Sequence, residues 1–340
     1  MDLGASLGTT NPVRSGARRD EIALAIDLGG TQYRVAAITR DAQMIARLSG
    51  LTRADEEPDV VIQDLADAVD AIRGQVVGRT ILGVGIIAPG PLDPSTGIVF
   101  QCPNLPRWHN VPLADELEAR VGLPTYLGND ANLAALAEAR HGAGRGAQHL
   151  VYLTVSTGVG SGVVVDGQLL LGEHGAGAEA GHMALSFDGP LCSCGNHGCL
   201  EAYASGTSLV RRAREALDGG RASSLRELAE IDAIDVATAA EQGDGLAQEL
   251  IEQAGRALGL GVRNLLHIFN PSVVVIGGGV SRIGPRLWDP MWQVVNSDAL
   301  TTYRQDLRIV PAELGDDSGL MGAAILVHEA RAHTPEPRGE

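Results

Sequence analysis

Three of the four cysteines lie within eight residues, at Cys192, Cys194 and Cys199. Clustered thiolates are typical of a metal site, and an imidazole as fourth ligand would complete a closed tetrahedral zinc site. His182 and His197 are both candidates, and His182 closes a longer loop that leaves more freedom to complete the tetrahedron. Because four protein ligands leave no open position, the pattern indicates a structural rather than a catalytic zinc.

Two glycine-rich segments, each between apolar stretches, could bind phosphate. They are residues 27–31, Asp-Leu-Gly-Gly-Thr, and residues 156–162, Ser-Thr-Gly-Val-Gly-Ser-Gly. Glycines let a turn approach a phosphate and offer it backbone N–H groups. Asp27, at the strand end, could hold Mg²⁺ directly or through water. Each segment alone could be an ordinary hairpin turn, but the two together favour a two-sided phosphate clamp.

A third glycine cluster, Gly277, Gly278 and Gly279, follows the apolar run at 273–276. Glycines at the carboxyl end of a strand suit a nucleotide that lies across the crevice there. The same residues could equally form a tight connection from a strand to a helix, so this cluster supports nucleotide binding only together with the other two.

Several polar residues could act on a hydroxylated substrate. Asp130 follows a short strand and could accept the proton of an attacking hydroxyl in a phosphoryl transfer, or it could cap the next helix. Glu179 and Glu201 flank the cysteines and could accept hydrogen bonds from a sugar, or they could be solvated loop charges. Asn104, in a Pro-Asn-Leu-Pro segment, has the same ambiguity.

Composition excludes several classes of protein. The net charge of −16 argues against nucleic-acid binding. All 26 basic residues are arginine, which excludes a P-loop lysine and a Schiff-base lysine. No apolar run approaches the roughly 20 residues that span a membrane, and residues 1–20 lack the apolar core of a secretory signal. We therefore expect a cytoplasmic protein with no membrane partner.

The elements that must position these residues alternate between strands and helices, which implies an α/β fold. Two hairpins with glycine-rich turns, about 130 residues apart, suggest a duplicated architecture. Apolar runs and turn residues predict strands at 22–26, 35–38, 81–87, 125–127, 150–155, 163–165, 273–276 and 307–311. Helical periodicity predicts helices at 58–77, 114–121, 131–141, 207–217, 224–242, 245–267 and 317–330.

These motifs together resemble the ROK family of sugar kinases, within the actin-like and hexokinase-like ATPase superfamily. The most specific match is Glu-Ala-Gly-His at 179–182 followed by Cys-Ser-Cys-Gly-Asn-His-Gly-Cys-Leu-Glu at 192–201. The resemblance covers residues 22 to about 330. It implies a two-lobed actin-like ATPase fold of the ribonuclease H type, with a duplicated α/β core and a zinc-bearing loop.

The resemblance also implies a division into lobes and a role for each motif. We expect a small α/β lobe at 21–128, completed by the helix at 317–332, a large lobe at 129–316 with the zinc loop, and flexible ends at 1–20 and 333–340. Asp130 would be the catalytic base and His182 the fourth zinc ligand beside Cys192, Cys194 and Cys199. The sugar would be held by Asn104, Asn129, Asp130, Glu179, His182 and Glu201. ATP and Mg²⁺ would be held by Asp27, Gly29, Gly30, Thr31, Thr157, Gly158, Gly277, Gly278 and Gly279.

The implied activity is ATP-dependent phosphorylation of a hexose at the 6-hydroxyl, with glucose as the leading substrate and a homodimer or dimer of dimers as the assembly. The segment at 179–201 is also similar to N-acetylmannosamine kinases, so that sugar, other N-acylhexosamines, mannose and fructose stay open. The family contains sugar-responsive repressors as well. Those carry a winged helix-turn-helix domain before the sugar-binding part, and only 21 residues precede the first predicted strand here.

Overall fold

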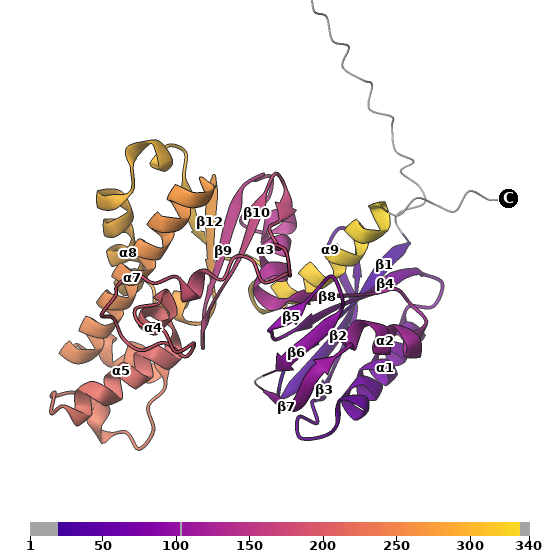
Figure 1. Cartoon of the computed structure of the whole chain (residues 1–340), viewed down its shortest axis with the longest axis horizontal. Coiled ribbons are helices and arrows are strands. Elements are labelled where there is room, and N and C mark those ends of the chain that lie inside the picture. The colour runs from indigo at the N-terminus through magenta and orange to yellow at the C-terminus, as the bar shows by residue number, and fades with distance from the viewer. Residues whose placement is uncertain (1–19, 103, 334–340) are drawn as a thin grey trace, which may run out of the picture.

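The computed structural model describes residues 20–102 and 104–333. The expected flexible ends at 1–20 and 333–340 lie, apart from their innermost residues, outside this described part. Two lobes flank a central pair of helices (Figure 1). Within the described residues, no helix is both long enough and apolar enough to cross a membrane.

A five-stranded mixed sheet forms the centre of the small lobe, in the order β3-β2-β1-β4-β8. Strand β2 pairs antiparallel with both β1 and β3, whereas β4 and β8 run parallel to β1. Strand β1 is apolar and almost wholly buried, as expected where a sheet is covered on both faces. The strands are β1 (Glu21–Leu28), β2 (Gln32–Thr39), β3 (Met44–Leu51), β4 (Thr80–Ala88) and β8 (Thr125–Asn129).

The large lobe repeats this arrangement in a second sheet of order β11-β10-β9-β12-β13. Here too a β-meander of three strands is followed by two strands that run parallel to its first strand. The duplicated α/β core predicted from the two glycine hairpins is therefore confirmed. The strands are β9 (Leu150–Val155), β10 (Val159–Val165), β11 (Gln168–Leu169), β12 (Val273–Gly277) and β13 (Arg308–Pro311).

Helices cover both faces of the small-lobe sheet. Helices α1 (Pro58–Gln75) and α2 (Leu113–Val121) pack on one face, and α9 (Ser318–His333) packs on the other. Helix α3 (Asp130–His141) packs against α9 and also against β9 and β10. Because α3 and α9 thus lie between the two sheets, they join the lobes, and the predicted division of the chain near Gly128 stays a prediction.

The largest core lies on the outer face of the second sheet, where strand residues pack against helices. Residues 224–242 do not form the single helix predicted: a short 3-10 turn at Ser224–Glu227 is followed by a separate α6. The reason is a capping box, in which the Asp232 carboxylate accepts from Asp235 N (2.8 Å) and the Asp235 carboxylate from Asp232 N (2.9 Å). The helices are α4 (Leu200–Ala204), α5 (Gly206–Asp218), α6 (Ala233–Glu241), α7 (Gly245–Phe269) and α8 (Pro285–Asp298).

A small third sheet, β5-β6-β7, was not predicted from the sequence. Its strands are β5 (Leu92–Asp93), β6 (Ile98–Cys102) and β7 (Leu105–Val111). In β7 the buried residues are Leu105, Trp108 and Val111, which are spaced by three rather than two. That spacing hides the alternation by which a strand is recognised in sequence.

The carboxyl ends of the parallel strands bring the functional segments to one edge of each sheet. In the small lobe Asp27 pairs with Ile87 of β4, and Ala88 pairs with Asn129 of β8. In the large lobe Thr154 of β9 pairs with Gly277 of β12. Loops that leave neighbouring parallel strands at the same end lie together, which is where open α/β sheets bind their ligands.

Candidate active site

A cavity of about 660 Å³ lies between the lobes. Its walls come from the loop after β4, the start of α3, the second glycine turn and the loop before the cysteines. It brings together seven of the residues that the sequence assigns to the site: Asn129, Asp130, Thr157, Gly158, Glu179, His182 and Glu201.

The structure assigns the helix cap to Asn129. The Asn129 Oδ1 accepts hydrogen bonds from Ala131 N (3.0 Å) and Asn132 N (3.4 Å) at the start of α3. Asp130 is the first residue of the helix, and its Oδ1 accepts from Ala131 N at 2.7 Å. Its other oxygen has no partner among residues 20–102 and 104–333, so this oxygen is available to a ligand.

Asp130 holds its proton more tightly than an ordinary aspartate. Cavity water reaches the side chain, but the surrounding protein removes much of its hydration, and this desolvation raises its pKa. The negative charge of Asp27 raises it further, and the bond from Ala131 N opposes both effects. Desolvation also raises the pKa of Glu179, with the charges of Asp130 and Glu201 adding to it. The site therefore gathers carboxylates that accept hydrogen bonds and protons.

The second glycine turn, residues 156–158 between β9 and β10, has two backbone N–H groups that form no hydrogen bond within the described chain. Ser156 N donates to Gly158 O at 2.9 Å and closes the turn, while the N–H groups of Thr157 and Gly158 have no partner within the described chain. The start of α5 supports the turn from outside, through Gly206 N to Ser156 O (2.7 Å) and Thr207 N to Thr157 O (3.4 Å). Consecutive free N–H groups are the chemistry of an anion site.

The first glycine turn has the same feature. Gly29 N donates to Gln32 O at 3.1 Å, and the N–H groups of Gly30 and Thr31 find no partner in the part of the chain described. Thr52, just after β3, supports the turn through Oγ1 to Gly29 O (2.8 Å) and N to Thr31 O (2.9 Å). Unlike the second turn, it does not line the cavity between the lobes.

Two further predicted residues, Asp27 and Asn104, also lie outside the cavity lining. The Asp27 carboxylate forms an ion pair with Arg34, with Nε 2.8 Å from Oδ2, and Arg34 also approaches Asp317 at 3.4 Å. Asn104 lies against the first turn, since a Cβ built on Gly30 would come within 2.3 Å of the Asn104 Cβ. Both residues are thus parts of the small lobe's own turn.

The third glycine cluster lies between two further cavities. Gly277, Gly278 and Gly279 line one of about 550 Å³, and Gly279 also lines one of about 920 Å³. Gly278 has a φ of +88°, and a Cβ there would come within 2.3 Å of Val155 O, so only glycine lets the chain leave β12 this close to β9.

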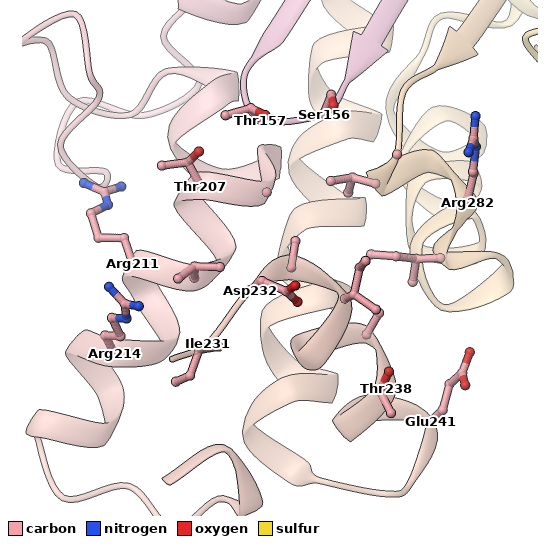
Figure 2. A pocket seen from close by; sticks show the side chains of 18 of the residues that line it. Ser156, Thr157, Thr207, Arg211, Arg214, Ile231, Asp232, Thr238, Glu241 and Arg282 are labelled. Carbon is pink, nitrogen blue, oxygen red and sulfur yellow. The ribbon is translucent and has the colours of Figure 1, made fainter. Parts of the chain in front are cut away.

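The 920 Å³ cavity opens beside the second glycine turn (Figure 2). Figure 2 shows Ser156 and Thr157 at one end, Arg211 and Arg214 on one side and Arg282 on the opposite side. Apolar walls come from the start of α6 and the 3-10 turn Val280–Ile283: Ile231, Ala233, Ile234, Val280 and Ile283. The sequence did not identify this wall. No local pattern marks it, because Ile234, in the first turn of α6, is an ordinary apolar residue in sequence and only the structure shows it 73% exposed.

The cysteine loop forms a compact four-residue cluster. The ligand atoms of His182, Cys192, Cys194 and Cys199 all lie within 4.8 Å of one another. The Sγ atoms of Cys194 and Cys199 are 3.8 Å apart, and Cys192 Sγ is 3.7 Å from His182 Nδ1. Tetrahedral zinc, with Zn–S of about 2.3 Å and Zn–N of about 2.0–2.1 Å, puts two sulfurs about 3.8 Å apart and sulfur and nitrogen about 3.6 Å apart.

The other histidine candidate lies outside this cluster. His197 Nδ1 is 3.0 Å from Gly189 O, which fixes the ring within the loop. A neighbouring amide, Asn196 Nδ2, approaches Cys194 Sγ at 3.6 Å, as expected for the shell around a metal thiolate. The donor set and spacing thus fit a structural zinc with His182 as the imidazole ligand.

Known proteins are similar to this chain over most of its length. The sequence matches the model of the ROK family over residues 23–330. The chain belongs to the ROK family. This ROK protein is 39% identical to a glucokinase of Thermotoga maritima, over 90% of this chain and 97% of that enzyme. It is also 30% identical to a xylose repressor of Caldicellulosiruptor bescii, over 98% of this chain and 85% of the repressor.

Solved structures of ROK proteins share the fold. A ROK hexokinase from Thermus thermophilus has a TM-score of 0.82 and 34% identity, over 92% of this chain and all of that one. A ROK glucokinase from Streptomyces griseus, in complex with glucose and AMPPNP, has a TM-score of 0.72 and 32% identity, over 91% of this chain and 99% of that one. The predicted fold class and family are therefore confirmed.

Proposed function

We propose that this ROK protein transfers the γ-phosphoryl group of ATP to the 6-hydroxyl of a hexose, and that glucose is the preferred sugar. The observation that carries the proposal is the position of Asp130. Its unpaired oxygen lies in the same cavity as the free N–H groups of Thr157 and Gly158. A proton acceptor beside an anion-binding turn is what phosphoryl transfer to an alcohol requires.

In this proposal the sugar occupies the 660 Å³ cavity. Glu179, His182 and Glu201 bind its hydroxyls from the large lobe, while Asn129 and Asp130 face it from the start of α3. Asp130 accepts the proton of the 6-hydroxyl as that oxygen attacks phosphorus. Its raised pKa suits this role, because a proton acceptor works best when its pKa lies nearer the working pH.

The nucleotide extends from the two glycine turns into the 920 Å³ cavity. We propose that Thr157 and Gly158 bind its phosphates from the large lobe, and that Gly29, Gly30 and Thr31 complete the grip. Those last three residues lie outside the cavity lining, so the proposal requires the lobes to close on the substrates, which also excludes water from the reaction. The nucleoside then lies beside the cluster of Gly277, Gly278 and Gly279, against the apolar wall of α6.

Two metals have separate places in this scheme. Asp27 keeps one oxygen, Oδ1, outside its ion pair with Arg34, and we propose that this oxygen binds the hydrated Mg²⁺ of the nucleotide. Zinc held by His182, Cys192, Cys194 and Cys199 would cross-link the loop that carries the sugar-binding side chains.

An assay of ADP release across glucose, mannose, N-acetylmannosamine, N-acetylglucosamine and fructose tests the proposal. We expect the highest kcat/KM with glucose. A clear preference for N-acetylmannosamine or fructose would support kinase activity but show that glucose is not the preferred sugar.

The similarity to xylose repressors makes a non-catalytic sugar sensor the second candidate. If calorimetry shows tight binding of a sugar, but none of the five sugars causes ATP to be converted to ADP, the protein is a sugar sensor and the kinase proposal is refuted.

A further inference from the structure

The carboxylate of Glu201 is bound on both sides. Its Oε2 accepts a hydrogen bond from Val159 N at 2.9 Å, and its Oε1 accepts one from Ser193 Oγ at 2.6 Å, with Cys192 Sγ 3.8 Å from the same oxygen. Val159 directly follows the second glycine turn, and Ser193 stands between Cys192 and Cys194. One side chain therefore connects the cysteine loop to the second glycine turn, across 42 residues of sequence.

The contact at the turn is close. A Cβ built on Gly158 would lie 2.7 Å from Glu201 Oε2, so a side chain there would push the carboxylate away. The turn is thus held at both ends, by the start of α5 at Ser156 and Thr157 and by Glu201 at Val159. The N–H groups of Thr157 and Gly158, between these supports, are the ones without a partner in the described structure.

A carboxylate in this position has an electrostatic disadvantage. The proposed occupant of the turn is a phosphate, and a negative charge beside an anion site weakens it by repulsion. A sugar contact alone does not require Glu201 to bind Val159 N. The bond to Val159 instead fixes the backbone where the turn joins β10, and so sets the directions of the two free donors.

We propose that Glu201 is a positioning residue for the second glycine turn, and that Ser193 links this turn to the order of the cysteine loop. The inference rests on the proposed function, in which nucleotide phosphates bind at this turn, and it adds a second role to the proposed sugar contact of Glu201. The cysteine loop would then support nucleotide binding as well as sugar binding.

The test is the Kd for Mg²⁺–AMP-PNP, measured by calorimetry without sugar. Glu201→Ala removes both hydrogen bonds and should weaken binding by ~3- to 10-fold, whereas Ser193→Ala removes one support and should weaken it by ~2- to 3-fold. Glu201→Gln keeps an oxygen for Val159 N and an amide donor for Ser193 and removes the repulsive charge, so its Kd should be no more than about 2-fold above that of wild type. Ser186→Ala is the matched control, because Ser186 is exposed in the same loop and its side chain has no hydrogen bond to the described residues.

The outcomes separate this inference from the proposed function. If wild-type protein does not bind Mg²⁺–AMP-PNP, the proposed function fails. If it binds and the Kd is the same for Glu201→Ala, Ser193→Ala and wild type, only the positioning role fails. A loss in Glu201→Gln as large as in Glu201→Ala would also overturn it, because charge rather than geometry would then matter. Should Glu201→Ala not fold, as judged by thermal melting and zinc content, Ser193→Ala and Glu201→Gln still decide.

A second readout distinguishes positioning from general structural damage. Glu201→Gln should raise the KM for glucose, since a sugar hydroxyl loses a charged acceptor, while leaving the Kd for the nucleotide unchanged. A variant that merely loosens the loop would change both together. If Glu201→Gln changed the KM for glucose and the Kd for the nucleotide by the same factor, the positioning role of Glu201 would be contradicted.

Discussion

The two glycine turns differ in what supports them, although each leaves its sheet in the same way. Each follows the first strand of its sheet, closes with one N–H bond and leaves two consecutive N–H groups without a partner among the described residues. The first turn is supported from within the small lobe, by Thr52, and has an Asp27–Arg34 ion pair at its base. The second turn has neutral Thr154 and Gly160 at the same place, and is supported by α5 and by Glu201.

This difference has a functional consequence. The first turn is supported by residues of its own lobe and has its own charge pair. The second depends on the cysteine loop, which holds it through Ser193 and Glu201. Disturbing the metal cluster should therefore weaken the second turn and spare the first.

The largest effect is expected at Asp130, which lines the same cavity as the second turn. Asp130→Asn should lower kcat by about 10³-fold, because the attacking hydroxyl loses its proton acceptor. Glucose and nucleotide binding, measured by calorimetry, should persist, because an asparagine amide can still hydrogen-bond to the sugar and the free N–H groups of both turns are untouched. Asp166→Asn is the control, since Asp166 has a φ of +51° that asparagine tolerates, and it should keep full activity. Normal turnover by Asp130→Asn would mean that another base operates.

Removing the metal should distinguish the turns next. Cys194→Ser should lose zinc, lower the Tm by roughly 5 °C and weaken nucleotide binding, since the loop beneath the second turn loses its cross-link. Elemental analysis, thermal melting and calorimetry measure the three effects. Cys102→Ala, in the small-lobe core, should lower stability but keep the zinc content. Full zinc content in Cys194→Ser would refute the ligand assignment.

Adding one methyl group to each turn sharpens the comparison. Gly158→Ala places a Cβ 2.7 Å from Glu201 Oε2 and should weaken nucleotide binding by about 10-fold. Gly30→Ala places one 2.3 Å from the Asn104 Cβ. Because Asn104 is predicted from the sequence to bind the sugar and the Gly30 N–H is retained, this variant should mainly raise the KM for glucose. Gly74→Ala, in α1 with open space around it, should leave both constants unchanged. If Gly158→Ala and Gly30→Ala changed nucleotide binding and the KM for glucose in the same way, the two turns would not act as separate units.

The smallest effect concerns the charge below the first turn. Asp27 raises the pKa of Asp130, so Asp27→Asn should lower that pKa, and the Arg34 cation that it releases acts in the same direction. Because Asp130 must be deprotonated to accept a proton, activity falls as the pH drops through its pKa. The acid limb of kcat/KM should therefore move to lower pH by a fraction of a unit, while the loss of the proposed Mg²⁺ contact lowers the height of the whole profile. A shift to higher pH would show that Asp27 does not act on Asp130 by its charge.

Some candidate site residues can be recognised from a short stretch of sequence, and others cannot. The glycine turns, Asp130 and the three cysteines were found in the sequence because each belongs to a short segment whose spacing carries the chemistry. Whether Asp130 caps α3 or accepts a proton could not be decided in that way, since an aspartate at the start of a helix suits both roles. The side-chain contacts assign the cap to Asn129.

The sequence by itself determined the α/β class, the duplicated core and which residues are chemically suited to a zinc cluster and a phosphate clamp. It could do so because apolar periodicity and glycine spacing express backbone preferences over a few residues. Only the tertiary structure decided the Asp27–Arg34 pair, the walls of the 920 Å³ cavity and the contact of Glu201 with Val159. These depend on how distant segments pack, and no local pattern records which side chains that packing brings together.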